Sequence, residues 1–435
     1  MPVRIDKLVF GGQGLGHADG KTVLAWNVLP GETVEVAVTR KRRGVVEGVA
    51  QTPAVGSPER SPERVEPHEA HYLSCSPWQV LSWSAEQEWK RRTTEETYAG
   101  IGRLELPASG TLEVVGDEAS QYGYRSKMEF SVTAGAPGAS PLQLAFFERG
   151  RHRLEPIDGC ELAATPINDV ARQLVTWLGA EGVDPRMAKS IVVRSDGAGH
   201  AVAAVFLRER RQFAQAPTVP SADGSLLGLS VYYSNPKSPA STPDEQLLVA
   251  GQDYLDVSVR AQSLRHGTLG FFQVNVPMFE RALADIEPWI TPGQPLLDLY
   301  GGVGSIGICA GARAGKLTIV DVDASGIEHA KRNLATAGRS NAEAVASTAE
   351  GALQYVTGDA TVVLDPPRAG LHSSVVRRLL AVAPPRIVYL SCNVSTQARD
   401  VALLSSQYKV SFAQLYNFFP RTPHVEGLLV LDRVH

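Results

Sequence analysis

Short apolar runs alternate with helix-like stretches through the last part of the chain, and this pattern most limits the folds available to it. The runs are PLLDLY (295–300), KLTIVD (316–321), ATVVLD (360–365) and RIVYLS (386–391), followed by VSFAQLYNFF (410–419) and GLLVLD (427–432). Strands that are buried on both faces have such nearly continuous apolar sequences. Repeated strand–helix units form a parallel sheet covered by helices. We therefore expect residues 266–435 to form a doubly wound α/β domain.

Different patterns in the first 265 residues predict further domains. Residues 1–54 contain short apolar runs joined by glycine-rich turns such as GGQGLGHADGK (11–21), which is typical of a small β-barrel. Residues 55–265 begin with a proline-rich linker that continues to 71, and a connecting helix is expected over 83–103. Strand-like runs and one helix candidate then predict a central α+β domain.

Composition and charge limit where the protein is expected to be located and what it can bind. No run of about 18 apolar residues is present, and the first residues lack a secretory signal, so we expect a cytoplasmic protein with no membrane contact. The four cysteines are scattered, which favours reduced thiols. A net charge of −4 gives no general attraction to nucleic acid, so RNA contact requires local basic surface. Four clusters in the first half predict such a face: 40–43, 90–92, 149–153 and 208–211.

A glycine-rich turn after the strand at 295–300 is the first candidate binding site. Gly302, Gly304 and Gly307 have the spacing G-x-G-x-x-G, so the backbone could approach a ligand at a helix N-terminus. Asp321 ends the next strand, where a carboxylate could accept ribose hydroxyl groups. NAD and S-adenosylmethionine both carry a ribose. The glycines alone leave a dehydrogenase, a methyltransferase and a purely structural turn open.

The ends of the later strands favour methyl transfer. Asp365 and Cys392 each end a strand, and Glu426 would reach the same edge if the last two strands form a hairpin. A thiolate that adds to carbon 6 of uracil makes carbon 5 nucleophilic, and a carboxylate could then remove the proton from carbon 5. The thiol would need positive surroundings, for which Arg368 and His424 are candidates. An isolated cysteine at a strand end is more often a packing residue, but this one accompanies the other motifs.

These motifs, taken together, resemble a known family. FFQVN (271–275), LLDLYGGVGS, LDPPRAG, YLSCN and TPHVEG are similar to the motifs of the RNA 5-methyluridine methyltransferases. The first 52 residues resemble the TRAM RNA-binding domain, and YGYRSKMEF (122–130) resembles a strand of the family's central domain. The resemblance implies a multidomain α/β protein with an OB-like TRAM barrel, a central α+β domain and a C-terminal Rossmann-like methyltransferase domain.

The resemblance also implies a role for each candidate residue. Cys392 would be the nucleophile and Glu426 the base that abstracts a proton. S-adenosylmethionine, the implied methyl donor, would be bound by Gln273, Tyr300, Gly302, Asp321 and Asp365. Phe271 and Phe272 are candidates for stacking on the target base, although core packing is favoured for both.

Several positions depart from the family pattern. Members that hold a [4Fe-4S] cluster have three cysteines just after the barrel and a fourth in the central domain, whereas this chain has Cys75 and Cys160 there. Two thiolates cannot supply the usual four ligands, so we predict no iron-sulfur cluster and no other metal. Val394 replaces the proline that usually follows the S-C-N motif, which could loosen the nucleophile's loop. Asn417 stands where many members have aspartate.

The target remains open between two RNA classes. Members with the barrel commonly modify large-subunit ribosomal RNA, and many bacterial enzymes for the T-loop of transfer RNA lack it, so 23S ribosomal RNA is favoured. A monomer is expected. Two other functions stay open: an RNA-binding or folding factor without catalysis, and an NAD-dependent oxidoreductase.

Overall fold

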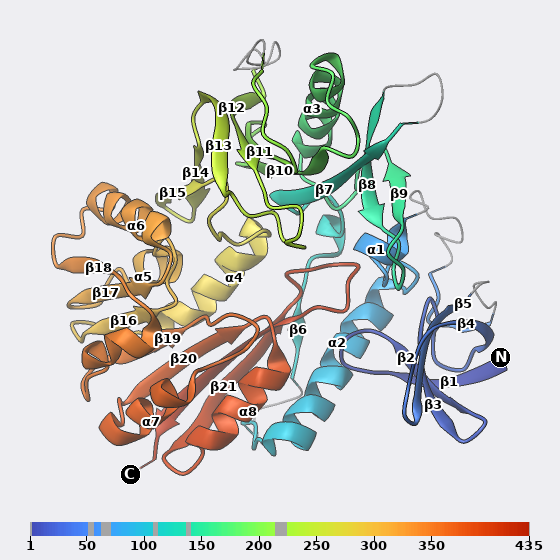
Figure 1. Ribbon diagram of the computed structural model, residues 1–435. Helices are drawn as coiled ribbons and strands as arrows, with labels where there is room; N and C mark the ends of the chain where they lie inside the picture. The colour runs from blue at the N-terminus through green and yellow to red at the C-terminus, as the bar shows by residue number, and fades with distance from the viewer. Residues whose placement is uncertain are drawn as a thin grey trace. The chain divides into compact units, whose positions relative to one another are not determined.

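The chain folds into two compact units (Figure 1). The computed structural model describes residues 2–50, 56–61, 71–107, 112–135, 141–213 and 224–434. Neither unit is continuous in sequence. The first comprises Met1–Leu8, Gly12–Ser82 and Ala119–Leu255, and the second comprises Val9–Gly11, Trp83–Glu118 and Asp256–His435.

The first unit begins with a closed five-stranded barrel, which confirms the predicted N-terminal β-barrel. Its strand order is β1-β2-β3-β5-β4. Alternate residues of β1, such as Val3 and Ile5, are buried in the barrel core. A side chain at Gly16 would place its Cβ 2.1 Å from the Arg4 carbonyl oxygen, so this close approach of two strands requires glycine. The strands are β1 (Pro2–Leu8), β2 (Gly14–Ala18), β3 (Lys21–Trp26), β4 (Thr33–Arg42) and β5 (Val45–Ala50).

A seven-stranded sheet with one long helix completes the first unit, as the α+β prediction requires. The strand order is β13-β12-β11-β10-β7-β8-β9. Helix α3 (Ile167–Ala180) buries Val170, Leu174 and Leu178 in the core that the sheet shares with it. The strands are β7 (Lys127–Ala134), β8 (Leu142–Phe147), β9 (Leu154–Ile157), β10 (Ala188–Ser195), β11 (Ala201–Leu207), β12 (Leu226–Tyr233) and β13 (Glu245–Gly251).

The second unit is the predicted doubly wound domain. Its sheet has the order β18-β17-β16-β19-β20-β22-β21-β6, with β16 to β20 parallel and the last two long strands joined as an antiparallel hairpin. The strands are β6 (Val114–Val115), β16 (Leu296–Leu299), β17 (Leu317–Asp321), β18 (Ala342–Ala346), β19 (Thr361–Leu364), β20 (Arg386–Ser391), β21 (Tyr408–Tyr416) and β22 (Glu426–Arg433). The main helices are α2 (Trp83–Thr97), α4 (Val276–Ile286), α5 (Ser305–Cys309), α6 (Ala324–Thr336), α7 (Ser373–Val382) and α8 (Val394–Leu404).

The unit boundaries differ from the domain limits predicted at residues 54 and 265. The barrel ends at Ala50 and shares one unit with the central sheet, and most of the predicted linker over 53–71 lies outside the described residues. Helix α2, expected to be part of the central region, belongs to the second unit, as does a small sheet of β14 (Tyr254–Val259) and β15 (Gln262–Gly267) from Asp256 onward. Tyr98, directly after α2, donates a hydrogen bond of 2.6 Å to Gln397 on α8. None of the described helices is long and apolar enough to cross a membrane.

Candidate active site

A cavity of about 660 Å³ lies at the carboxyl ends of the parallel strands of the second unit. The topology explains its position, because ligands of doubly wound sheets bind at this edge. The cavity brings together the predicted catalytic and donor-binding residues, while their roles remain predictions. Those lining residues are Gln273, Tyr300, Gly302, Asp321, Asp365, Cys392 and Glu426.

The glycine loop is held in an unusual backbone conformation. Tyr300, Gly302 and Gly304 have φ angles of 64°, 55° and 85°, in the left-handed region that favours glycine. The Gly302 amide donates a hydrogen bond of 2.9 Å to Asp321 Oδ2, and the Asp323 amide donates one of 2.8 Å to Asp321 Oδ1. Asp321 therefore fixes the loop and still lines the cavity, where its oxygens can accept further donors.

The buried residue Asp298 supports the glycine loop, and the sequence reasoning missed this role. Its side chain is completely buried, and its Oδ2 accepts a hydrogen bond of 2.8 Å from the Gly307 amide. Burial raises the pKa of Asp298 to about 7. The available signal was an acidic residue inside the otherwise apolar strand β16, since such a residue needs a buried partner.

The segment FFQVN positions Gln273 against Asp365. Gln273 Nε2 donates a hydrogen bond of 3.3 Å to Asp365 Oδ2. Asn275 holds the segment, because its Oδ1 caps α4 at the Met278 amide and its Nδ2 donates to the Phe418 carbonyl oxygen at 3.1 Å. Burial, with repulsion from Asp298, raises the pKa of Asp365 to about 7.

The two phenylalanines of this segment have different surroundings. Phe272 is 3% exposed and stacks on His266 with ring centroids 4.4 Å apart, so it is a core residue. Phe271 is 67% exposed and lines the cavity. Phe271 is therefore the aromatic side chain of this pair that is available for stacking on a ligand.

Cys392 follows β20 directly and lines the cavity with Glu426. Burial raises the pKa of the Cys392 thiol to about 11, and the carboxyl groups of Glu426 and Asp365 act in the same direction. Arg368 opposes them and donates a hydrogen bond to the sulfur. The predicted positive partner is thus Arg368, whereas His424 is exposed and does not line the cavity.

Glu426 begins β22 and pairs with Tyr416 across the final hairpin, as predicted. Its side chain is 1% exposed. Burial, with repulsion from Asp365, raises the pKa of Glu426 well above its usual range. The surroundings in the cavity therefore favour the protonated forms of both the thiol and this carboxyl group.

Hydrogen bonds hold the Cys392 loop although Val394 replaces proline. Asn393 Oδ1 caps α8 at the Ser395 amide, and Asn393 Nδ2 donates a hydrogen bond of 2.8 Å to the Arg368 carbonyl oxygen. Val394 is completely buried at the first turn of the helix. These contacts hold the loop in place of the proline, and the predicted effect of Val394 on its mobility stays a prediction.

Close packing determines the residue that follows Glu426. A Cβ at Gly427 would lie 2.6 Å from Tyr98 Oη and 2.8 Å from Gln397 Oε1. Gln397 Nε2 donates to the carbonyl oxygens of Tyr389 and Gly427, at 2.8 and 2.9 Å. The glycine of the PHVEG motif therefore lets α8 and Tyr98 approach the strand that carries Glu426.

A buried polar network holds the loop between β21 and β22. Lys90 Nζ donates to Glu86 Oε1 at 2.8 Å, to Asn417 Oδ1 at 2.5 Å and to the Phe419 carbonyl oxygen at 3.1 Å. Glu86 also accepts hydrogen bonds of 3.1 Å from the Arg421 amide. Asn417, one of the departures from the family pattern, is thus a neutral partner in a network that already contains one carboxylate.

The predicted basic clusters are partly exposed and partly buried or paired. Arg92, Arg151, Arg153 and Arg210 have exposed side chains that also pair with carboxylates. Lys90 is buried, and Arg149 stacks over Trp26, 4.2 Å from the ring centroid. Arg210 forms an ion pair of 2.5 Å with Glu245. Exposed cations follow one another on the barrel and its adjoining turn: Arg40, Lys41, Arg42 and Arg43.

The cavity suits S-adenosylmethionine. The left-handed glycine loop lets the backbone approach the donor, and Asp321 can accept ribose hydroxyl groups. Val322, next to Asp321, provides apolar surface for a purine ring. Asp365 and Glu426 also line the cavity, and a positively charged ligand there would favour their ionised forms.

Comparisons with known proteins agree with this arrangement. Residues 244–434 match the family model described as tRNA (Uracil-5-)-methyltransferase. The crystal structure of the Pyrococcus abyssi tRNA (uracil-54, C5)-methyltransferase in complex with S-adenosyl-L-homocysteine shares the fold. Its TM-score is 0.76 at 24% identity, over 99% of this chain and 100% of that chain.

Two curated relatives extend over nearly the whole chain. The 23S rRNA (uracil(1939)-C(5))-methyltransferase RlmD of Halomonas elongata is 28% identical over 98% of this chain and 88% of its own. An RNA methyltransferase of Nitratidesulfovibrio vulgaris is 30% identical over 99% of this chain and 96% of its own. The chain therefore belongs to the S-adenosylmethionine-dependent RNA uracil-5-methyltransferase family.

Proposed function

We propose that this protein methylates carbon 5 of a uridine in structured RNA through a covalent adduct with Cys392. The observation that carries the proposal is the meeting of Cys392, Glu426 and the glycine loop in one cavity. Strands β16, β20 and β22 bring these groups together from positions far apart in the sequence.

The donor-binding side of the cavity consists of the glycine loop, Asp321 and the Gln273–Asp365 pair. S-adenosylmethionine, when bound, supplies the methyl group. Asp321 would accept hydrogen bonds from the ribose, and Gly302 would leave room for the donor near Tyr300. Asp365, joined to Gln273, would face both the donor and the thiol, since it interacts electrostatically with Cys392.

The chemical steps follow from the groups around Cys392. The thiol releases its proton to solvent, aided by the hydrogen bond from Arg368, and the sulfur adds to carbon 6 of uracil. Carbon 5 of the resulting enolate takes the methyl group as the methyl–sulfur bond of the donor breaks, and S-adenosylhomocysteine leaves. Glu426, in its ionised form, removes the proton from carbon 5, and the carbon–sulfur bond breaks to release 5-methyluridine and the thiolate.

The substrate must enter as an extruded base, because carbons 5 and 6 of a stacked uridine are inaccessible. Phe271, which is exposed and lines the cavity, would stack on that base. RNA is the substrate class of the family. We favour 23S ribosomal RNA, supported by the Halomonas elongata relative and by the N-terminal barrel. Transfer RNA is the alternative. A cytoplasmic location, no membrane contact and a monomeric state remain predictions.

Trapping with 5-fluorouridine RNA tests the covalent step. Fluorine at carbon 5 cannot leave as a proton does, so the methylated adduct should persist and migrate as an RNA–protein band on a denaturing gel. We expect the band with wild type and none with Cys392→Ala. The variant Glu426→Gln should form an adduct with unmodified uridine RNA, because the proton at carbon 5 stays in place. Equal trapping by wild type and Cys392→Ala would refute the proposal.

Mapping of 5-methyluridine in total RNA tests the target. RNA from cells with and without the gene should differ at a uridine of 23S ribosomal RNA, and expression of Cys392→Ala should not restore the modification. A loss confined to transfer RNA would support the alternative target. Calorimetry should show binding of S-adenosylmethionine and not of NAD.

A further inference from the structure

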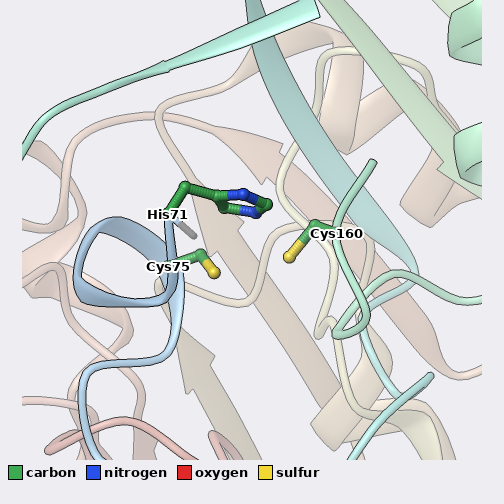
Figure 2. A group of neighbouring side chains, drawn as sticks. All are labelled: His71, Cys75 and Cys160. Carbon is green, nitrogen blue, oxygen red and sulfur yellow. The ribbon is translucent and has the colours of Figure 1, made fainter. Parts of the chain in front are cut away.

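Three potential metal ligands meet in the first unit. They are His71, Cys75 and Cys160, whose donor atoms all lie within 4.8 Å of one another (Figure 2). His71 directly precedes the short helix α1 (Tyr72–Cys75), and Cys75 is the last residue of that helix. Cys160 follows β9 (Leu154–Ile157). We propose that these three residues bind a single thiophilic divalent cation, for which Zn²⁺ is the expected ion.

The donor set matches zinc chemistry. Thiolate and imidazole are the preferred zinc ligands, and two thiolates neutralise the charge of the ion. Tetrahedral zinc with ordinary bond lengths separates neighbouring ligand atoms by about 3.3–3.8 Å. The observed separations of 4.8 Å or less therefore need only a small contraction, which side-chain torsions can supply.

Burial and second contacts hold the donors in place. Cys160 is 1% exposed, and Asn168 binds its backbone twice, accepting from the amide and donating to the carbonyl oxygen, both at 3.0 Å. His71 is 6% exposed, and its ring lies against Phe146 with centroids 5.3 Å apart. Donors that are held in this way lose little freedom when an ion binds.

Helix α1 is fastened to the central sheet beside the cluster. Ser74 Oγ donates a hydrogen bond of 2.7 Å to the Phe147 carbonyl oxygen, at the end of β8. Arg149 donates to the carbonyl oxygens of Leu73 and Ser74. An ion at the cluster would join the segment after the barrel to the segment before α3, with both already aligned.

The cluster also borders open space. His71 lines a cavity of about 280 Å³, which has room for an ion and for a water molecule at the fourth coordination position.

These residues do not fit the family's four-cysteine iron-sulfur cluster. The whole chain has four cysteines, and the other two, Cys309 and Cys392, belong to the second unit. The local set is therefore two thiols and one imidazole, a combination known for mononuclear zinc. The proposal revises the sequence-based prediction of no metal, and it does not depend on the proposed reaction.

Elemental analysis of the purified full-length chain tests the proposal. We expect an equimolar amount of zinc after purification or after reconstitution with Zn²⁺, and loss of most of it in Cys75→Ser, Cys160→Ser and His71→Gln. The matched controls are Cys309→Ser, a buried cysteine of the other unit, and His200→Gln, an exposed histidine of the same unit; both should keep the metal. Reconstitution of wild type with Co²⁺ should give thiolate-to-cobalt charge-transfer absorption that Cys160→Ser lacks.

Thermal unfolding provides a second readout that does not require a variant. A chelator should lower the unfolding temperature of wild type, and added Zn²⁺ should restore it. Cys160→Ser should not respond to the chelator. The proposal is wrong if reconstituted wild type holds no metal, if the Cys75→Ser/Cys160→Ser double variant retains it, if iron and sulfide are bound instead, or if the two cysteines form a disulfide.

Discussion

Glu86 and Lys90 lie one turn apart on α2 and form an ion pair of 2.8 Å in which both side chains are completely buried. Burial lowers the pKa of Lys90, and the carboxylate of Glu86 opposes this change. The pair lies against the loop that follows β21, since Lys90 also donates to Asn417 and Phe419. A helix that precedes the central domain thus positions one wall of the cavity.

Replacement of one partner should be far more damaging than replacement of both. Lys90→Met leaves a buried carboxylate with less compensation and should lower the free energy of unfolding by about 3–5 kcal/mol. The double variant Glu86→Gln/Lys90→Met should lose less than Lys90→Met alone. Urea unfolding monitored by fluorescence measures both. Arg92 is an exposed residue of the same helix, and Arg92→Met should lower the free energy of unfolding by at most about 1 kcal/mol. A loss in Lys90→Met no larger than that in Arg92→Met would contradict the argument.

The reactivity of Cys392 should rise steeply with pH. With a pKa of about 11, the thiolate fraction increases about tenfold for each pH unit through neutral and mildly alkaline solution. Site-resolved mass spectrometry after iodoacetamide treatment should show this slope between about pH 7 and pH 9, and a plateau below pH 9 would exclude the raised pKa. Arg368→Gln removes the opposing cation, so it should slow alkylation further.

An added methyl group next to Glu426 should disturb the site. In Gly427→Ala the new Cβ would approach Tyr98 Oη to 2.6 Å, and we expect a loss of about 1–3 kcal/mol in stability. Tyr98→Phe removes the nearest atom, so the double variant should recover part of the loss. Gly100→Ala is the matched control, because nothing lies within 4 Å of its added Cβ. No recovery in the double variant would show that the clash with Tyr98 is not the cause.

Asp298 should make the protein less stable as pH rises. Its pKa is about 7 in the folded chain and about 3.9 in an unfolded one, so the folded state binds more protons between these values. Stability contributed by this group is therefore lost between about pH 4 and pH 7. Relative to wild type, Asp298→Asn should have a higher free energy of unfolding at pH 8 than at pH 5. The difference between the two pH values should be roughly 1–4 kcal/mol.

Unfolding temperatures at the two pH values check this prediction. The exposed Asp359→Asn should show no such difference between them. An equal effect of Asp298→Asn at both pH values would mean that Asp298 does not titrate in this range.

The sequence predicted the residues that lie at the strand ends. Asp321, Asp365 and Cys392 follow parallel strands, and parallel strands place their carboxyl ends at one edge, so local patterns were sufficient. Strand β18 was missed because its sequence AEAVA has small side chains and only partial burial. Sequence patterns also do not show which distant residue will be the partner of a buried polar group.

Partners distant in sequence account for the remaining misses. Lys90 was taken as part of a basic surface, yet its partner Asn417 lies 327 positions later. His71 was not considered with Cys75 and Cys160, because the turn that carries Cys160 reaches it only in the folded first unit. The pKa of Cys392 likewise depends on Glu426 of β22 and on Asp365 and Arg368 after β19, and no local pattern predicts a raised value.

The edge strand β6 pairs with β21, so contacts between residues some three hundred positions apart in the sequence complete the second unit. During translation, α2 and β6 must wait for the final hairpin. Until then the buried polar face of α2, with Glu86 and Lys90, lacks its partners from the loop after β21. Chains that stop before β21 should therefore expose this helix to chaperones and proteases.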